Sequence, residues 1–558
     1  MTMKNEESKL KFEVRFTEHE SDPVPGEVQL IAPFDNWNDF GYKINCKAKL
    51  WNPRLERPFY FECFIGFLPP DKNAEEEIYN DYFKNYHREG RSLADMMGYI
   101  EHLTENNALN ELRFFTMLPT MKDYRAAVEE LGPQLLQDML ETIHDLVYFK
   151  NRSSSWFADA LDSEVFNLGF MRNSEPFYAF NNADSILHGV DEERFEGISE
   201  SLKLRYKLDG FENAHEVNLN YDQSALVPKR INILIGKNGI GKSQALNSFC
   251  RAALRYKDKN VSLGVGEGNE RPMINRLLAI GTPGETQNTF PTERRTSQKL
   301  YYRRLSLTRN ARAKASKSIS DMLIQLARSS ERLGKKSRWN LFLDAIGNVL
   351  PLEDLVLRTK NNTYVKLKNL ASGDGEQATL EKWAKINKKS DPMLLISEEP
   401  HSMSSGQLTF FKFALLCCLY IENGSFVLLD EPETHMHPNM ITDFVELLDE
   451  ILENTGSLAL IATHSAYFVR EIPQDQVHVF KKEANNVCIS NPRLITFGAP
   501  VDSISRFVFD DDAESKLAEK LYLRIKRQNT TFEDIVNTLG DEISVAAMMK
   551  LRQKMEEA

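Results

Sequence analysis

The chain has 558 residues, of which 42% are hydrophobic and 27% are charged, and this composition is ordinary for a globular protein of two to four domains. A net charge of −12 argues against general binding of nucleic acid, and no apolar run is long enough to span a membrane. The first residues show no apolar signal and the six cysteines form no C-x-x-C pair, so we expect a cytoplasmic protein with reduced thiols and no zinc site.

Residues 1–195 are expected to form a separate N-terminal accessory module of α+β type. Apolar and β-prone runs predict strands at Leu10–Phe16, Glu27–Ala32 and Phe59–Phe67. Helical patterns follow between Asp71 and Tyr148. The aromatic segment Phe34–Tyr42 is either a packed loop or a surface for a partner, and packed loops are the commoner case.

Residues 196–500 alternate short apolar strands with helical patterns, which predicts an α/β domain with a largely parallel sheet. The strands are expected at Leu202–Tyr206, Ile231–Ile235, Met273–Ile280, Phe426–Leu429 and Leu458–Ala462. Residues 290–392 interrupt this rhythm and are expected to be a basic helical insertion. Residues 501–558 are expected to be a helical C-terminal region.

Basic residues are concentrated between residues 292 and 338, a segment that contains fourteen Lys/Arg residues and three acidic ones. Such a segment is a solvated face, a contact for an acidic protein or a surface for nucleic acid. If it is helical, Lys299 and Arg303 lie one turn apart beside Arg304, with two neighbouring tyrosines available for stacking on bases.

Residues 236–243 fit the phosphate-binding pattern G-x-x-x-x-G-K-[ST], between an apolar strand and a helical pattern. The glycines allow backbone N–H groups to turn toward phosphates. Lys242 would supply a charge for the β- and γ-phosphates of ATP, and Ser243 a hydroxyl for Mg²⁺. The candidate ATP-binding residues of this loop are Gly236, Asn238, Gly239, Gly241, Lys242 and Ser243.

Two later strands end in residues suited to ATP chemistry. The stretch FVLLDEPETHMHP carries Asp430, which would hold Mg²⁺ through water, and Glu431, which would orient the attacking water. The stretch LALIATHSA ends in His464, which would contact the γ-phosphate at the carboxyl edge of the sheet. An acidic turn after a strand is common by itself but improbable after a phosphate-binding loop, so we assign Glu431 and His464 as candidate catalytic residues.

The stretch MSSGQ, residues 403–407, allows two interpretations. Serines before an apolar run commonly cap an ordinary helix. The order of the motifs along the chain, however, resembles that of ABC-type ATPases, which carry an LSGGQ signature at this place. In that class the signature helix docks on the γ-phosphate held by the other subunit. The resemblance therefore implies that Ser404, Gly406 and Gln407 bind ATP across a homodimer, with Ser405 in place of one glycine.

These motifs together resemble the soluble ABC-type ATPases of the OLD, RecF and SMC branch, over roughly Ser201 to Asp512. DEPETHMHP is similar to the DEPExHLHP of OLD-like defence ATPases. The cluster Asp510–Asp512 lies outside any strand pattern, so we expect no nuclease of the OLD kind in this chain. The insertion is too short for the coiled coil of an SMC protein. The sequence is then most similar to the Septu and retron-associated ATPases, the PtuA family.

The resemblance implies an ATPase that binds ATP and Mg²⁺, forms a homodimer or a higher oligomer, and controls a separate nuclease in anti-phage defence. The alternative is a RecF-like DNA-repair ATPase. A transporter subunit is disfavoured because large additions flank and interrupt the nucleotide domain. A scaffold without turnover is disfavoured because Glu431 occupies the position of a catalytic base.

Overall fold

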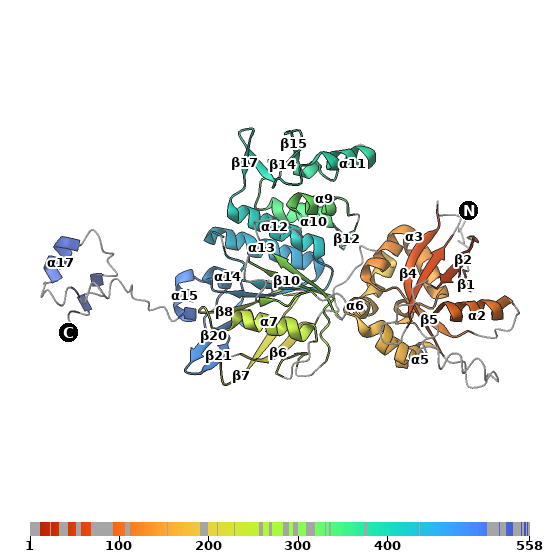
Figure 1. Cartoon of the computed structure of the whole chain (residues 1–558). Coiled ribbons are helices and arrows are strands. Elements are labelled where there is room, and N and C mark those ends of the chain that lie inside the picture. The colour runs from red at the N-terminus through yellow and green to blue at the C-terminus, as the bar shows by residue number, and fades with distance from the viewer. Residues whose placement is uncertain are drawn as a thin grey trace, which may run out of the picture.

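The structure is a computed structural model (Figure 1). It describes residues 12–22, 24–32, 43–51, 57–68, 93–105, 112–152, 154–189, 199–208, 210–227, 229–255, 260–266, 270–282, 289–293, 300–307, 318–329, 331–333, 336–372, 376–434, 436–509, 524, 532–539, 548–549, 552–553 and 555. The segments Phe34–Tyr42 and Asp510–Asp512, and also Lys299, Arg309 and Arg312, lie outside these ranges.

The N-terminal module is a five-stranded sheet flanked by helices, in line with the α+β character that the sequence predicts. Its strands, in sheet order, are β1 (Glu13–Thr17), β2 (Glu27–Ile31), β3 (Asn45–Leu50), β4 (Phe59–Phe67) and β5 (Phe114–Met117). Its helices are α2 (Leu93–Glu105), α3 (Met121–Thr142), α4 (Leu146–Phe149), α5 (Phe157–Asp162) and α6 (Ser174–Asn182). Strand β5 falls where a helical pattern was expected, because all four of its residues are buried and it shows no alternation.

The main sheet has seven strands in the order β11-β10-β18-β19-β8-β20-β21. All neighbours pair in parallel except β20 and β21, which are antiparallel. The fold-class prediction of an α/β core with a largely parallel sheet is therefore confirmed. In chain order the strands are β8 (Ile231–Gly236), β10 (Arg276–Gly281), β11 (Tyr301–Ser306), β18 (Ser425–Asp430), β19 (Leu458–Thr463), β20 (Val477–Glu483) and β21 (Asn486–Ser490).

Helices cover both faces of this sheet, so its central strands are buried throughout (Figure 1). The helices of the core and the C-terminal region are α7 (Lys242–Ala253), α9 (Ile319–Ala327), α10 (Arg338–Gly347), α11 (Glu376–Lys385), α12 (Ser405–Tyr420), α13 (Pro438–Thr455), α14 (Ala466–Arg470), α15 (Val501–Phe509) and α17 (Phe532–Leu539). Leu234 of β8 packs with α7 and the N-terminal module in one hydrophobic core, whereas Ile233 and Ile235 pack with α12 and α13 in the other.

Smaller sheets flank the main one. An antiparallel sheet in the order β7-β6-β9 lies over α7, and another in the order β15-β14-β16-β17 directly precedes α12. Their strands, with the short pair β12 and β13, are β6 (Ser201–Lys207), β7 (Ala214–Asn220), β9 (Ser262–Val265), β12 (Arg332–Leu333), β13 (Lys336–Ser337), β14 (Leu355–Arg358), β15 (Tyr364–Lys366), β16 (Met393–Ile396) and β17 (Glu399–Ser402). Within the described ranges, every helix falls short of the length or apolarity that crossing a bilayer requires.

The predicted boundary of the insertion, residues 290–392, is wrong at its N-terminal side. Strand β11 pairs in parallel with β10 along its whole length, so residues 301–306 belong to the main sheet. Arg303 and Arg304 therefore lie on a strand, so the helical spacing expected for them is wrong. The segment also contains strands β12 to β15, so it is mixed rather than helical. The cause is tertiary pairing: β10 supplies a partner strand that local sequence periodicity does not reveal.

Candidate functional site

Strand β8 and helix α7 shape the phosphate-binding loop. Gly236 ends β8, and a Cβ at this position would lie 2.7 Å from the carbonyl oxygen of Phe480. Gly241 is the N-cap residue of α7 and has φ 102°, a left-handed conformation that favours glycine. A Cβ there would also lie 2.7 Å from the side chain of Leu208. Close packing requires glycine at position 236, and close packing together with a left-handed backbone requires it at position 241. The loop between them leads to the N-terminus of α7, where free backbone N–H groups can bind an anion.

The ammonium group of Lys242 lies over this loop. Its Nζ donates to the carbonyl oxygens of Gly236, at 2.9 Å, and of Lys237, at 3.1 Å. Burial lowers the pKa of Lys242, whereas the nearby carboxylates of Glu431 and other acidic residues oppose this shift. The lysine charge is therefore held in a partly desolvated place beside the loop, where its attraction for phosphate is strengthened.

Asp430 joins three distant segments of the chain. It ends β18 and is only 2% exposed. Its Oδ1 accepts a hydrogen bond from Ser243 Oγ at 2.9 Å, and its Oδ2 accepts one from Thr289 Oγ1 at 2.6 Å. Asn247 of α7 in turn donates to the Thr289 carbonyl at 2.7 Å, which fixes Thr289 in place. The donor set consists of oxygen atoms only, as a hard cation such as Mg²⁺ prefers.

Glu431 follows Asp430 in a strained conformation. Its φ is 47°, in the left-handed region that a non-glycine residue adopts at a cost of about 1–3 kcal/mol. Its N–H donates to the Ala462 carbonyl at 2.9 Å, and its own carbonyl accepts from Thr434. These bonds hold the backbone in the turn and leave the carboxylate half-buried, 3.7 Å from Nδ1 of His464. The structure thus brings the two candidate catalytic residues together.

The carboxylate of Glu433 bonds to the turn that carries His464. Its Oε1 accepts hydrogen bonds from Thr463 Oγ1 at 2.6 Å and from the His464 N–H at 2.9 Å, and it lies 3.1 Å from His464 Nδ1. The side chain is 7% exposed, and burial raises the pKa of its carboxyl group. Its Oε2 is buried without a hydrogen-bond partner in the described part of the chain. Glu433 therefore connects the end of β18 to the end of β19.

The MSSGQ segment forms a capped helix N-terminus. Ser404 Oγ accepts from the Gln407 N–H at 3.2 Å, and Gln407 Oε1 accepts from the Ser404 N–H at 2.9 Å, which is a complete capping box. Gly406 is buried, whereas Ser404 and Ser405 are exposed. In the described residues no hydrogen bond joins Ser404 or Gln407 to the phosphate-binding loop. The interpretation as an ordinary cap thus describes the local structure, and binding of ATP in trans stays a prediction.

Sequence reasoning missed two residues of this site. Glu433 lies inside the quoted acidic motif, and its place two residues after Glu431 could have marked it. Thr289 follows β10 without any motif, so only the folded chain shows its contact with Asp430.

Comparisons with known proteins point to an ATPase domain. The family model "AAA domain, putative AbiEii toxin, Type IV TA system" matches residues 395–470, from β16 to α14. Protein ea59 of Escherichia phage lambda is 22% identical over 544 residues, which is 95% of each chain. A "Putative ABC transporter ATP-binding protein" of Streptococcus pneumoniae is 26% identical over 176 residues, covering 32% of this chain and 27% of that protein.

A solved SMC head, bound to the C-terminal winged-helix domain of ScpA, covers 52% of this chain and 96% of its own. It is 10% identical with a TM-score of 0.29, a value too low to carry an argument. The family match falls on the helix, strands and turns that surround Asp430, beside the phosphate-binding loop. Residues 395–470 are therefore similar to an AAA-type ATPase domain, and this part of the chain carries Asp430, Glu431 and His464.

Proposed function

We propose that this chain binds ATP with Mg²⁺ and hydrolyses it as a switch that controls a partner. The observation that carries this proposal is the hydrogen bond between Ser243 and Asp430, at 2.9 Å across 187 residues of sequence. It joins the phosphate-binding loop to the acidic strand end, and this contact supports a shared Mg²⁺ site beside the phosphates of ATP.

Each residue of the site has a part in this proposal. Lys242 and the loop N–H groups would hold the phosphates, while Ser243 and Asp430 would hold Mg²⁺, with Thr289 orienting the carboxylate. Bound ATP supplies the γ-phosphoryl group, and Mg²⁺ neutralises its charge. Glu431 would orient the attacking water and accept its proton, and His464 would donate a hydrogen bond toward the γ-phosphate.

The test is ATP binding and phosphate release by the purified full chain. We expect Mg²⁺-dependent hydrolysis, and weaker ATP binding when Lys242→Ala removes the charge at the loop. Arg506→Ala is a matched control, because Arg506 is an exposed residue of α15. Wild-type ATP binding in the Lys242→Ala protein would overturn the assignment of the site.

We further propose that Ser404, Gly406 and Gln407 complete the site of a second copy in an ATP-bound homodimer. The resemblance of MSSGQ to the ABC signature and the exposed position of Ser404 support this.

The similarity of DEPETHMHP to OLD-like defence ATPases supports a cytoplasmic role in anti-phage defence with a separate nuclease. The basic segment 292–338 is the place where we propose nucleic acid would bind. Purifying the native complex and identifying its nucleic acid and protein components separates this role from that of a RecF-like repair ATPase.

A further inference from the structure

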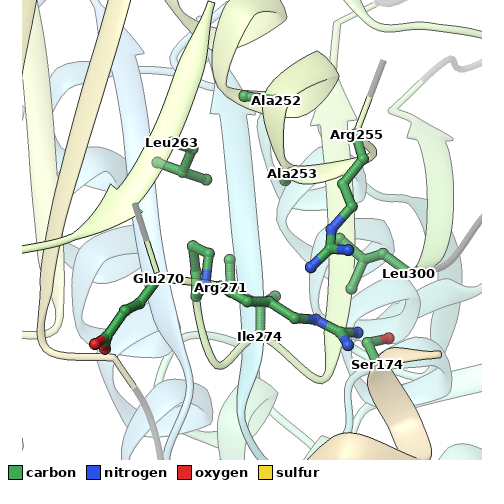
Figure 2. A pocket seen from close by; sticks show the side chains of 10 residues that line it. Ser174, Ala252, Ala253, Arg255, Leu263, Glu270, Arg271, Ile274 and Leu300 are labelled. Atoms are coloured by element: carbon green, nitrogen blue, oxygen red, sulfur yellow. The ribbon is translucent and has the colours of Figure 1, made fainter. Parts of the chain in front are cut away.

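A pocket of about 350 Å³ lies at the far end of α7 from the phosphate-binding loop (Figure 2). Helix α7 starts at Lys242, and its twelve residues span about 18 Å at 1.5 Å per residue. Its last two residues line the pocket, whose lining is Ser174, Ala252, Ala253, Arg255, Leu263, Glu270, Arg271, Pro272, Ile274 and Leu300. The segment 270–274 precedes β10, so this pocket lies at the amino edge of the parallel sheet, whereas the loop lies at the carboxyl edge.

Two guanidinium groups converge in this pocket. Figure 2 shows those of Arg255 and Arg271 pointing into the same space, while the carboxylate of Glu270 points away from both. In the described part of the chain neither arginine forms an ion pair, and Arg255 has no side-chain hydrogen bond. Arg271 donates from one nitrogen to the Met171 carbonyl at 2.8 Å and lies 4.6 Å from the centre of the Phe177 ring, which orients it from the N-terminal module.

The backbone at Arg255 has the left-handed conformation that commonly ends a helix. Arg255 follows the end of α7 with φ 57°, and its N–H bonds to the Ala252 carbonyl at 2.9 Å. Glycine is the usual residue in this left-handed position, and arginine adopts it here. Burial, and then the charge of Arg255, lower the pKa of Arg271 to about 10, so the two like charges act on each other. An anion placed between them would remove this repulsion.

We propose that this pocket is a second ligand site, which binds a small phosphate ester of nucleotide size. Paired guanidinium groups present parallel N–H donors that match phosphate oxygens. The lining also contains the apolar side chains of Ala252, Leu263 and Leu300, which suit a ring or another apolar part of the ligand. The volume lies within the usual range of about 300–1,000 Å³ for small-molecule sites. This site is separate from the one that we propose for ATP.

The test is equilibrium binding of AMP, GMP, CMP, UMP and inorganic pyrophosphate to the full chain, each probe alone. The measurements use a Lys242→Ala background, so that binding at the phosphate-binding loop does not mask the second site. We expect at least one probe to bind, and Arg255→Ala to weaken it by roughly tenfold or more, since it removes a charged hydrogen-bond donor. Arg506→Ala in the same background should bind as the parent does.

Arg255→Ala is the main variant because the Arg255 side chain is exposed and holds no other residue of the described chain. Arg271→Gln is the second variant, and its melting temperature must be compared with that of the parent, because Arg271 also contacts Met171. Binding that survives both changes would overturn the proposal, as would the failure of every probe to bind at millimolar concentration. ATP binding to the protein with intact Lys242, measured in parallel, reports on the ATP site independently.

Discussion

The carboxylate of Glu422 lies 2.9 Å from the guanidinium of Arg125, and both side chains are buried. Arg125 belongs to α3 of the N-terminal module, whereas Glu422 lies between the end of α12 and the start of β18. Arg338 of α10 contacts the other oxygen of Glu422 at 3.2 Å. Burial by itself would raise the pKa of Glu422, but the charges of Arg125, Arg338 and Arg276 lower it to about 2. One carboxylate thus joins the module to the element that carries Asp430.

We predict that Glu422→Gln destabilises the protein by about 3–5 kcal/mol, because it leaves buried arginine charges without compensation. The measurement is thermal or urea unfolding of the full chain. Glu453→Gln is a matched control: Glu453 pairs with Arg230 at 3.0 Å but is 63% exposed, so its loss should cost about 1 kcal/mol or less. Equal costs for the two variants would contradict the special role of Glu422.

The lowered pKa of Glu422 also predicts how the stability of the fold changes with pH. The pKa of Glu422 is lower in the folded chain than in the unfolded one, so its contribution to stability is present above the unfolded value. It is lost as the pH falls from about 4.3 toward 2. Across this window Glu422→Gln should lose less stability than the wild type does, and parallel curves would count against the assignment.

We predict that Glu431→Gln slows ATP hydrolysis by roughly a hundredfold or more while ATP still binds, because the orientation of water is lost and the phosphate contacts remain. Phosphate release and equilibrium binding of ATP measure the two effects separately. Hydrolysis at the wild-type rate would show that Glu431 is not the base.

Glu433→Gln should act differently, because Glu433 is buried and its carboxylate holds Thr463 and the His464 backbone in place. We expect kcat to fall roughly tenfold or more through misplacement of His464, with little change in ATP affinity. The melting temperature should stay equal or rise, since the neutral amide buries no charge. A purely structural role would instead lower the melting temperature and leave kcat of the folded fraction unchanged. Glu433→Asp, which keeps the acceptor, should restore part of the rate.

A composite site makes a prediction about mixed dimers. Subunits with Lys242→Ala and subunits with Ser404→Arg should each be inactive alone, and their mixture should recover partial activity, because one intact site remains in each mixed dimer. Activity is measured after mixing, with two affinity tags to demonstrate that heterodimers form. Heterodimers without recovered activity would contradict the trans arrangement.

The proposed nucleic-acid contact needs variants outside β11. Arg303 bonds to Glu293 at 3.2 Å and lies 4.7 Å from the centre of the Tyr420 ring, and Arg304 donates to the Phe290 carbonyl, so changing them perturbs the sheet. Arg309→Glu with Arg312→Glu should reduce binding of the full chain to nucleic acid, and wild-type affinity should fall steeply with salt. Arg506→Glu is the control. Salt-insensitive or unchanged binding would leave the segment as a protein contact.

The chemistry of the loop could be predicted from sequence because glycine, lysine and serine at fixed spacing form a local structure. The meeting of Ser243 with Asp430 follows as well, since parallel strands bring their carboxyl ends to one edge. The place of β11 could not be predicted, because its pairing with β10 is a contact between distant segments. Thr289 and the left-handed backbone of Glu431 depend on the same tertiary contacts, which no local pattern reports.

Strand β11 is the last described strand on its side of the main sheet, and two of its N–H groups are already taken by side chains. The Tyr301 N–H donates to Ser174 Oγ at 3.3 Å, and the Arg304 N–H donates to Glu293 Oε1 at 2.8 Å. An incoming peptide extends a sheet by bonding to free backbone groups along its edge. N–H groups three residues apart on a strand point to opposite edges, and Ser174 also bonds to the carbonyl of Asn275 directly before β10, so the Tyr301 N–H faces the neighbouring strand. On the open edge it is therefore the Arg304 N–H that Glu293 already occupies, which disfavours β-augmentation at that position.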